Sequence, residues 1–163
     1  MKKIVMLLFI VVVSCTTAQE KKEFTSKGLQ DKLLTLEGNE IAFSEILEKH
    51  KGKKIMLEVW ASWCSDCIKG MPKLKEMQNK SSEDVVYLFL SLDRSIDAWK
   101  AGIDKHDLNG NHYFLRSGWK GDFCKSIDLD WIPRYMVVNP LGEITVYKAI
   151  KATEPSLLNA VLK

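Results

Sequence analysis

The 163-residue sequence predicts a single α/β domain, with a central sheet that is covered by helices on both faces. Residues 54–60 and 85–92 form two nearly continuous apolar runs, which are typical of buried central strands. Each run is followed by a segment with a helical pattern, over residues 64–78 and 95–105. A hairpin and a last helix then close the chain. This alternation of strands and helices is typical of an α/β fold.

The N-terminal part of the domain predicts two short strands and a helix. The strands are expected at 33–36 and 40–43, on either side of a turn. Ser44 is a suitable N-cap for a helix that ends at Lys51 and Gly52. Residues 19–30 are mostly polar and predict a tether, so the domain is expected to span residues 31–163.

The C-terminal part begins with residues 107–120, which are rich in Gly and Asn and predict a loop. A short helix is expected at 122–127. Residues 134–138 and 143–147 flank Asn-Pro-Leu-Gly, which predicts a hairpin. Pro155 is placed to open a final helix that runs to Leu162.

Residues 1–18 predict a signal peptide. Lys2 and Lys3 precede ten apolar residues, a stretch too short for a comfortable membrane span but suitable for a secretory signal. Residues 12–15, Val-Val-Ser-Cys, resemble a bacterial lipobox, in which cleavage leaves a lipid-modified Cys15. Thr-Thr-Ala at 16–18 instead fits ordinary cleavage before Gln19. We favour the lipobox, and with either outcome we expect the domain in the periplasm, free or anchored on the periplasmic side.

The charge of the chain gives no reason to expect a nucleic-acid partner. The formal charge is +3, and without Lys2 and Lys3 there are 22 basic and 21 acidic residues, which leaves about +1. We expect a monomer.

The residues that carry chemistry are Cys64 and Cys67, a Cys-x-x-Cys pair between the strand 54–60 and the following helix. This spacing puts both sulfurs on the first helical turn, close enough to form a disulfide. Unpaired helix N–H groups and the helix dipole stabilise a thiolate at Cys64. Cys67 is more enclosed and holds its proton longer. We therefore predict that Cys64 attacks a substrate disulfide and that Cys67 resolves the mixed disulfide.

Two other interpretations of the pair are weaker. A structural zinc site needs four ligands, and no second Cys-x-x-Cys or His pair lies at a suitable spacing. A purely structural disulfide would close too short a loop to stabilise the fold much. We expect no metal and no organic cofactor, because the dithiol itself carries two electrons.

Three stretches carry a family resemblance: residues 58–67 (EVWASWCSDC) with Pro72, residues 33–44, and residues 132–144. The first is similar to the active-site segment of thioredoxins. The other two resemble segments of the exported TlpA/ResA-like thiol–disulfide oxidoreductases. The resemblance runs from about Leu33 to the C-terminus, except for 107–120. It implies a thioredoxin-like fold, a mixed sheet with helices on both faces and an N-terminal hairpin extension.

The resemblance also implies a substrate-binding surface. Pro133 would be a cis-proline packed against the dithiol, and it would expose the Ile132 backbone to an extended substrate strand. Trp63 would flank and partly shield the dithiol. The alternative for Pro133 is an ordinary trans proline at the start of an edge strand.

Glu58 is the one charge inside the apolar run 55–60, and the resemblance implies that it relays a proton to and from Cys67. Burial raises a carboxyl pKa toward neutrality, which suits an acid and base near pH 7. Thioredoxins more often have Asp at this position. The alternative is a Glu58 that faces solvent at an edge.

These observations together predict an exported thiol–disulfide oxidoreductase. Asp66 adds negative charge beside Cys64, which disfavours its thiolate, so we expect reduction of protein disulfides. Cys124 has no apparent partner and is expected to be a small buried hydrophobe, with a second redox thiol as the alternative. A thiol peroxidase of related fold, and a non-catalytic envelope module such as a copper carrier, remain alternatives.

The resemblance implies partners as well. The substrates would be protein disulfides, with those of apocytochrome c during cytochrome c maturation as one possibility, and the electron donor would be a membrane reductase of the thiol-relay type.

Overall fold

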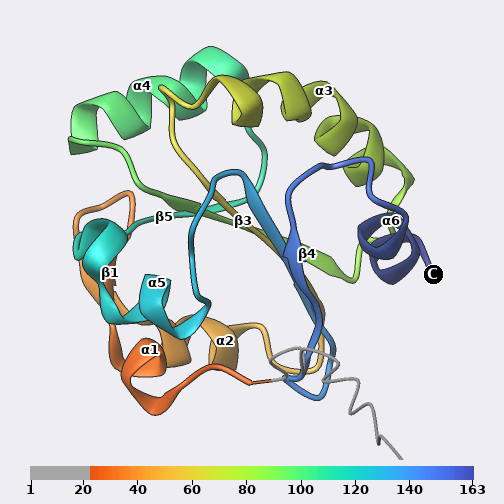
Figure 1. The fold of residues 1–163 in the computed structure, drawn as a ribbon, viewed down its shortest axis with the longest axis horizontal. Helices are drawn as coiled ribbons and strands as arrows, with labels where there is room; N and C mark the ends of the chain where they lie inside the picture. The colour runs from red at the N-terminus through yellow and green to blue at the C-terminus, as the bar shows by residue number, and fades with distance from the viewer. Residues whose placement is uncertain (1–22) are drawn as a thin grey trace, which may run out of the picture.

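The computed structural model describes residues 23–163 (Figure 1). The expected signal peptide, and with it the candidate lipidation site Cys15, lies outside these residues. None of the helices in the described part is both long and apolar enough to cross a membrane.

A mixed sheet of seven strands forms the centre of the domain, in the order β2-β1-β5-β4-β3-β6-β7. Strand β4 pairs in parallel with β3 and β5, and the remaining neighbours are antiparallel. The strands are β1 (Lys32–Leu34), β2 (Glu40–Ala42), β3 (Lys54–Trp60), β4 (Val85–Ser91), β5 (Asn111–Phe114), β6 (Arg134–Val138) and β7 (Ile144–Ala149).

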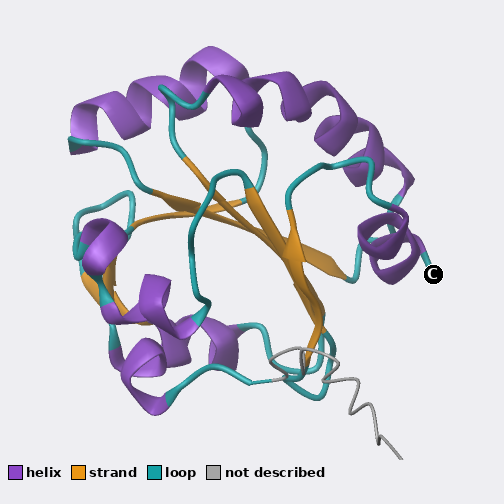
Figure 2. Ribbon diagram, in the orientation of Figure 1, coloured by secondary structure: helices purple, strands orange, loops and turns teal. Residues whose placement is uncertain are grey.

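Helices cover both faces of this sheet (Figures 1 and 2). On one face lie α3, α4 and α6, and on the other lie α1, α2 and α5, which contact one another. The helices are α1 (Ser26–Gln30), α2 (Phe43–Lys49), α3 (Ser65–Lys80), α4 (Ile96–His106), α5 (Asp122–Ser126) and α6 (Pro155–Leu162), with a 3-10 turn, η1 (Gly118–Lys120), before α5. The predicted α/β class and the mixed sheet with an N-terminal hairpin are therefore confirmed.

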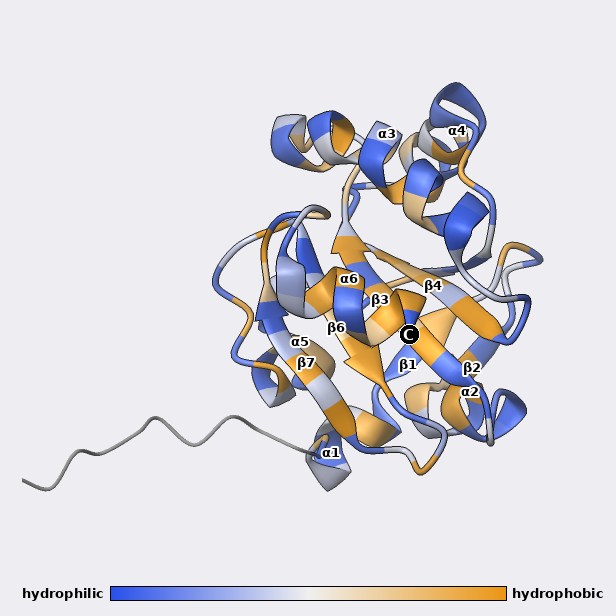
Figure 3. Ribbon diagram, turned by 90° about the vertical axis from the view of Figure 1, so that its right-hand side faces the viewer, coloured by the Kyte–Doolittle hydropathy of each residue, from blue (hydrophilic) through white to orange (hydrophobic). Residues whose placement is uncertain are grey.

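Strands β3 and β4 are buried on both faces, as their apolar runs predict. Every residue of β3 after Lys54, and every residue of β4 after Val85, is buried. Figure 3 shows hydrophobic strands inside a layer of helices that also carry hydrophilic residues. The polar Glu58 in β3 is therefore held inside a region that otherwise excludes water.

The prediction of a tether over residues 19–30 is wrong for its C-terminal part. Residues 26–30 form α1, which Thr25 caps with its side chain, and Phe24 packs in the core. The ring of Phe24 contacts those of Phe43 and Phe123, at centroid distances of 4.9 and 6.2 Å. A five-residue helix has little intrinsic stability, so it depends on these distant contacts, which no local pattern reveals.

The N-cap of α2 also differs from the prediction. The helix begins at Phe43, and Ala42 takes the N-cap position in place of Ser44. The Glu45 carboxylate accepts a hydrogen bond of 2.7 Å from the Ala42 N–H. A carboxylate on the first turn thus satisfies the N–H group of the N-cap residue, and the helix begins two residues earlier than a Ser44 N-cap would place it.

Strand β5 lies within the segment predicted to be a loop. It pairs with β4 on one side and through Leu34 with β1 on the other. Gly110 precedes it at a φ of 151°, and a Cβ there would lie 2.7 Å from the Phe89 ring. This glycine is therefore required for the close approach to β4, although in the sequence it reads as a turn signal.

Candidate active site

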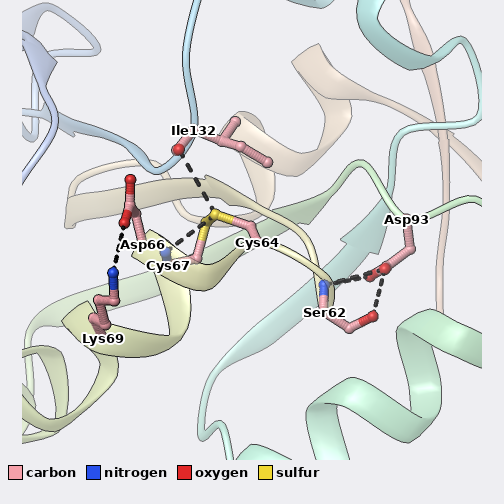
Figure 4. Close-up of a disulfide and its surroundings, with 7 residues drawn as sticks. All are labelled: Ser62, Cys64, Asp66, Cys67, Lys69, Asp93 and Ile132. Atoms are coloured by element: carbon pink, nitrogen blue, oxygen red, sulfur yellow. Dashed lines mark hydrogen bonds and ion pairs between the residues drawn. A yellow bond between two sulfur atoms is a disulfide. The ribbon is translucent and has the colours of Figure 1, made fainter.

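Cys64 and Cys67 form a disulfide at the start of α3, with an S–S distance of 2.08 Å and a Cα–Cα distance of 5.3 Å (Figure 4). Strand β3 ends at Trp60, and a short connection leads to Cys64, which is the N-cap of α3. The Cys64 sulfur accepts a hydrogen bond of 3.1 Å from the Cys67 N–H. One unpaired N–H group of the first helical turn is therefore aimed at this sulfur, where it stabilises negative charge.

The two sulfurs differ in their access to solvent. Cys64 is 5% exposed and lines a cavity of about 280 Å³, whereas Cys67 is fully buried and lies outside it. Trp63 and Ile132 line the same cavity as Cys64, so the fold brings these three predicted site residues together. Trp119 and Trp131 complete the aromatic lining. Neither was predicted from the sequence, because nothing local separates an exposed tryptophan from a core one.

The loop before β6 crosses directly over the disulfide. The Ile132–Pro133 peptide bond is cis, and the Ile132 carbonyl oxygen lies 3.6 Å from the Cys64 sulfur. In the reduced protein, a Cys64 thiol can donate a hydrogen bond to this oxygen. Pro133 lines a neighbouring cavity of about 340 Å³, which it shares with Tyr135 and Gly70.

Two buried polar groups, neither of which was predicted from the sequence, hold the loops around the disulfide. Asp93, just after β4, accepts hydrogen bonds from the Ser62 N–H and the Ser62 hydroxyl, the latter at 2.6 Å (Figure 4). Arg134 is 1% exposed and pairs with Asp130, and it also donates to the Ile127 carbonyl at 3.4 Å. These contacts hold the segment that precedes Cys64 and the loop that carries Ile132.

Glu58 lies on the same face of the sheet as α3. It stands opposite Tyr135 in the register of β3 and β6, so the two side chains share a face. The Tyr135 hydroxyl contacts α3 at Gly70, where an added Cβ would lie 2.8 Å from it. The carboxyl group therefore lies between β3 and the helix that carries Cys67.

The surroundings of Glu58 keep it protonated at neutral pH. Burial raises the pKa of Glu58 to about 8, and the nearby Tyr135 hydroxyl acts in the opposite direction. Neither carboxyl oxygen has a hydrogen-bond partner of regular geometry among residues 23–163. An unpaired charge in an apolar interior is costly, so the proton is retained. The same burial raises the pKa of Tyr135.

Asp66, Cys124 and the absence of a metal were the remaining predictions for the site. Asp66 is paired with the Lys69 ammonium at 3.3 Å, so part of its negative charge is neutralised beside Cys64. Cys124 is a free cysteine that is buried in α5. Within residues 23–163, no group of three or more His, Cys, Asp or Glu side chains is arranged to hold a metal ion.

Comparison with known proteins agrees with this geometry. A family model described as thioredoxin-like matches residues 52–144, which is more than half of the chain. The thiol–disulfide oxidoreductase ResA of Bacillus thuringiensis is 30% identical, over 78% of this chain and 70% of its own. The thioredoxin-like protein YneN of Bacillus subtilis is 26% identical, over 72% of this chain and 74% of its own.

Solved structures give the same result. The thioredoxin domain of a thiol–disulfide oxidoreductase from Bacteroides vulgatus superposes with a TM-score of 0.65 at 25% identity, over 83% of this chain and 94% of that domain. The chain therefore belongs to the thioredoxin-like family and, within it, to the protein thiol–disulfide oxidoreductases.

Proposed function

We propose that this protein reduces disulfides of exported proteins by dithiol exchange, with Cys64 as the nucleophile and Cys67 as the resolving thiol. The observation that carries the proposal is the difference between the two sulfurs. Cys64 opens into a cavity and accepts an N–H hydrogen bond, and Cys67 is enclosed behind it. A substrate disulfide can therefore meet Cys64 before Cys67.

The reaction transfers two electrons from the enzyme to the substrate. The Cys64 thiolate attacks one sulfur of the substrate disulfide, which forms a mixed disulfide and releases one substrate thiolate. The Cys67 thiolate then attacks the Cys64 sulfur, which forms the enzyme disulfide and releases the second substrate thiolate. The enzyme dithiol is oxidised, the substrate is reduced, and the two thiol protons of the enzyme end on the two substrate thiols.

In its ionised form, which is a minority at pH 7 and about half of the carboxyl at pH 8, Glu58 is the proposed proton acceptor for Cys67 in the second step. In its protonated form it is the proposed donor when the enzyme is reduced again. Its place between β3 and α3 and its raised pKa, about 8, support this role. The test is the lifetime of the mixed disulfide. We expect Glu58→Gln to lengthen it by about a hundredfold at pH 8, with a smaller effect at pH 6. Equal lifetimes for the two proteins at pH 8 would remove Glu58 from the mechanism.

The Ile132 backbone is the proposed pairing site for an extended substrate segment, with Pro133 and Trp63 beside it. The closeness of the Ile132 carbonyl to Cys64, at 3.6 Å, supports this role, because a strand bonded there would carry its cysteine to the nucleophile.

Reduction is the proposed direction of exchange because Asp66 lies near Cys64, although its pairing with Lys69 weakens the effect. A membrane reductase of the thiol-relay type is the proposed electron donor. The N-terminal sequence supports export, with Cys15 as the proposed lipid anchor, and apocytochrome c is one proposed substrate.

Insulin reduction provides the test. The reduced protein is expected to precipitate insulin chains, and Cys64→Ser is expected to lose this activity. A protein that consumes peroxide but leaves insulin intact would instead be a thiol peroxidase. The variant Cys67→Ala stalls the mixed disulfide at Cys64, so mass spectrometry of trapped complexes from the envelope would identify the substrates.

A further inference from the structure

The five tryptophans of the chain divide into two groups. Trp60 and Trp99 are fully buried in the core. Trp63, Trp119 and Trp131 are 49%, 39% and 54% exposed, and all three line the cavity into which Cys64 opens. Large exposed apolar groups that gather at one place mark binding sites, and tryptophan is among the residues that contribute most to binding energy. The gathering of all three exposed indoles at the nucleophile therefore needs an explanation beyond chance.

The three indoles come from separate segments, and side-chain contacts hold two of these segments in place. Trp119 lies in η1, beside Ser117, whose hydroxyl donates to the Asp31 carboxylate at 2.8 Å. Trp131 lies between Asp130, which pairs with the buried Arg134, and Ile132. These contacts restrain the backbone that carries Trp119 and Trp131, so binding there costs less conformational entropy than it would in an unrestrained loop.

We propose that Trp63, Trp119 and Trp131 form a recognition pocket for a large apolar side chain, aromatic above all, near the cysteine of the substrate disulfide. The inference rests on the proposed function, since a substrate must reach Cys64 for the pocket to matter. It adds a substrate preference to that function: the preferred substrate is an unfolded or extended protein segment with an apolar residue close to its cysteine.

The size of the cavity suits one side chain. Its volume of about 280 Å³ is below the range of roughly 300–1,000 Å³ that is usual for sites of small organic ligands. Cys64 is only 5% exposed, and its sulfur forms part of the cavity lining. A substrate that places its cysteine on Cys64 must therefore place neighbouring atoms against the indoles.

The position of the recognised residue follows from strand geometry. In an extended segment, residues two apart point to the same side and are separated by about 6.6 Å along the strand. If the segment pairs with Ile132 and directs its cysteine to Cys64, the residue two positions away points to the same side. That residue is the proposed occupant of the pocket.

The charge of the lining favours an apolar occupant over a charged one. Asp66 is the one charged residue of the lining, and it is paired with Lys69 at 3.3 Å. A glutamate in the pocket would be repelled by Asp66. A lysine would interact with the indole faces but would lose hydration, and the Asp66 carboxylate would not compensate fully because it is already paired with Lys69.

The experiment uses a series of single-cysteine peptides, each oxidised to its symmetric disulfide, with Phe, Ala, Lys or Glu at both positions two residues from the cysteine. The measured quantity is the second-order rate constant with which the pre-reduced protein reduces each peptide. We expect the Phe peptide to react about tenfold faster than the Ala peptide, and the Glu peptide to be the slowest.

Variants assign this preference to the pocket. In the double variant Trp119→Ala/Trp131→Ala, the ratio of the Phe rate to the Ala rate is expected to fall to within twofold of one. Each ratio is measured on a single protein sample, so loss of folded protein lowers both rates and cancels. Leu141→Ala removes an apolar residue that is 83% exposed and lines a different cavity, and this control is expected to keep the tenfold ratio.

Three results would overturn the inference: equal rates for the Phe and Ala peptides with the unmodified protein, a tenfold ratio that survives in the double variant, or a preference for Lys over Phe. Failure of the proposed function looks different. In that case the pre-reduced protein would reduce neither the peptides nor hydroxyethyl disulfide, a small disulfide that needs no pocket.

Discussion

Cys64 and Cys124 are both buried, with exposed fractions of 5% and 1%, yet they lie in regions of opposite character. Around Cys64, a helix N–H donates to the sulfur, a carbonyl oxygen lies 3.6 Å away, and a cavity reaches it. Cys124 lies in α5 beside Phe123, whose ring contacts Phe43 at a centroid distance of 4.6 Å. Burial and the charge of Asp31 raise the pKa of the Cys124 thiol to about 12.

The difference shows that burial by itself does not decide whether a cysteine reacts. With a pKa near 12, only about one Cys124 thiol in 10⁵ is ionised at pH 7. At Cys64, the helix N-terminus supplies a donor to the sulfur and the cavity supplies a path to it. The residues around Cys124 stabilise the fold, whereas the residues around Cys64 make its thiol reactive.

The largest expected contrast concerns activity. Cys64→Ser is expected to reduce the rate of insulin-disulfide reduction to that of the uncatalysed reaction, because no other described thiol reaches the cavity. Cys124→Ala is expected to retain at least half of the rate, measured well below its melting temperature. Comparable losses in both variants would mean that Cys124 takes part in the redox cycle.

The next largest expected difference is between the alkylation rates of Cys64 and Cys124 in the native protein. When the reduced protein is treated with iodoacetamide at pH 7, Cys64 is expected to be labelled several orders of magnitude faster than Cys124, because the thiolate is the reactive form. Peptide mass spectrometry over time gives both rates. Labelling in guanidinium chloride is the control, since both thiols then react alike. Labelling of native Cys124 as fast as Cys64 would contradict the comparison.

Glu58 is expected to make the stability of the active-site region depend on pH. Its pKa is raised from 4.5 to about 8 in the folded protein, so between these values the unfolded chain loses a proton that the folded protein keeps. The contribution of this proton to the free energy of unfolding is therefore largest below about pH 4.5, and it is lost as the pH rises to about 8. The expected loss is about 1.4 kcal/mol per pH unit.

Urea unfolding of the oxidised protein between pH 5 and pH 8 measures this slope, with the disulfide intact so that Cys64 and Cys67 do not titrate. Glu58→Gln is expected to remove this part of the slope. Glu45→Gln is a matched control on the surface of α2 and is expected to keep it. An unchanged slope in Glu58→Gln would show that the carboxyl is not the group responsible.

The smallest expected effect concerns the apolar region around Cys124. Phe123→Leu keeps a hydrophobic side chain but disturbs the ring contacts with Phe24 and Phe43, so the free energy of unfolding is expected to fall by about 1 kcal/mol. Urea unfolding measures the loss. The rate of insulin reduction is expected to stay the same, and a parallel loss of activity would mean that the two regions are coupled.

Much of the fold could be predicted because its signals are local. The apolar runs predicted β3 and β4, the helical pattern over 95–105 predicted α4, and Pro155 opens α6 as expected. In each case residues adjacent in sequence determine the structure. The Cys64–Cys67 pair belongs to this group, because three residues of helix bring the sulfurs together.

The features that escaped prediction depend on residues that are distant in sequence. Helix α1 is stabilised by contacts with α5, and β5 is a strand because β4 and β1 flank it. Asp93 is 31 residues from Ser62, whose backbone and side chain it binds. A single sequence contains no signal for such pairs.

The sequence by itself therefore determined the class of fold, the place of the dithiol and the strand that leads to it, because short-range hydrogen bonding and periodicity encode them. The tertiary structure alone decided the shape of the cavity at Cys64, which tryptophans line it and which residues enclose the Glu58 carboxyl. Those properties are set by packing between separate segments, where burial, the local dielectric environment and access to solvent arise only after the chain has folded.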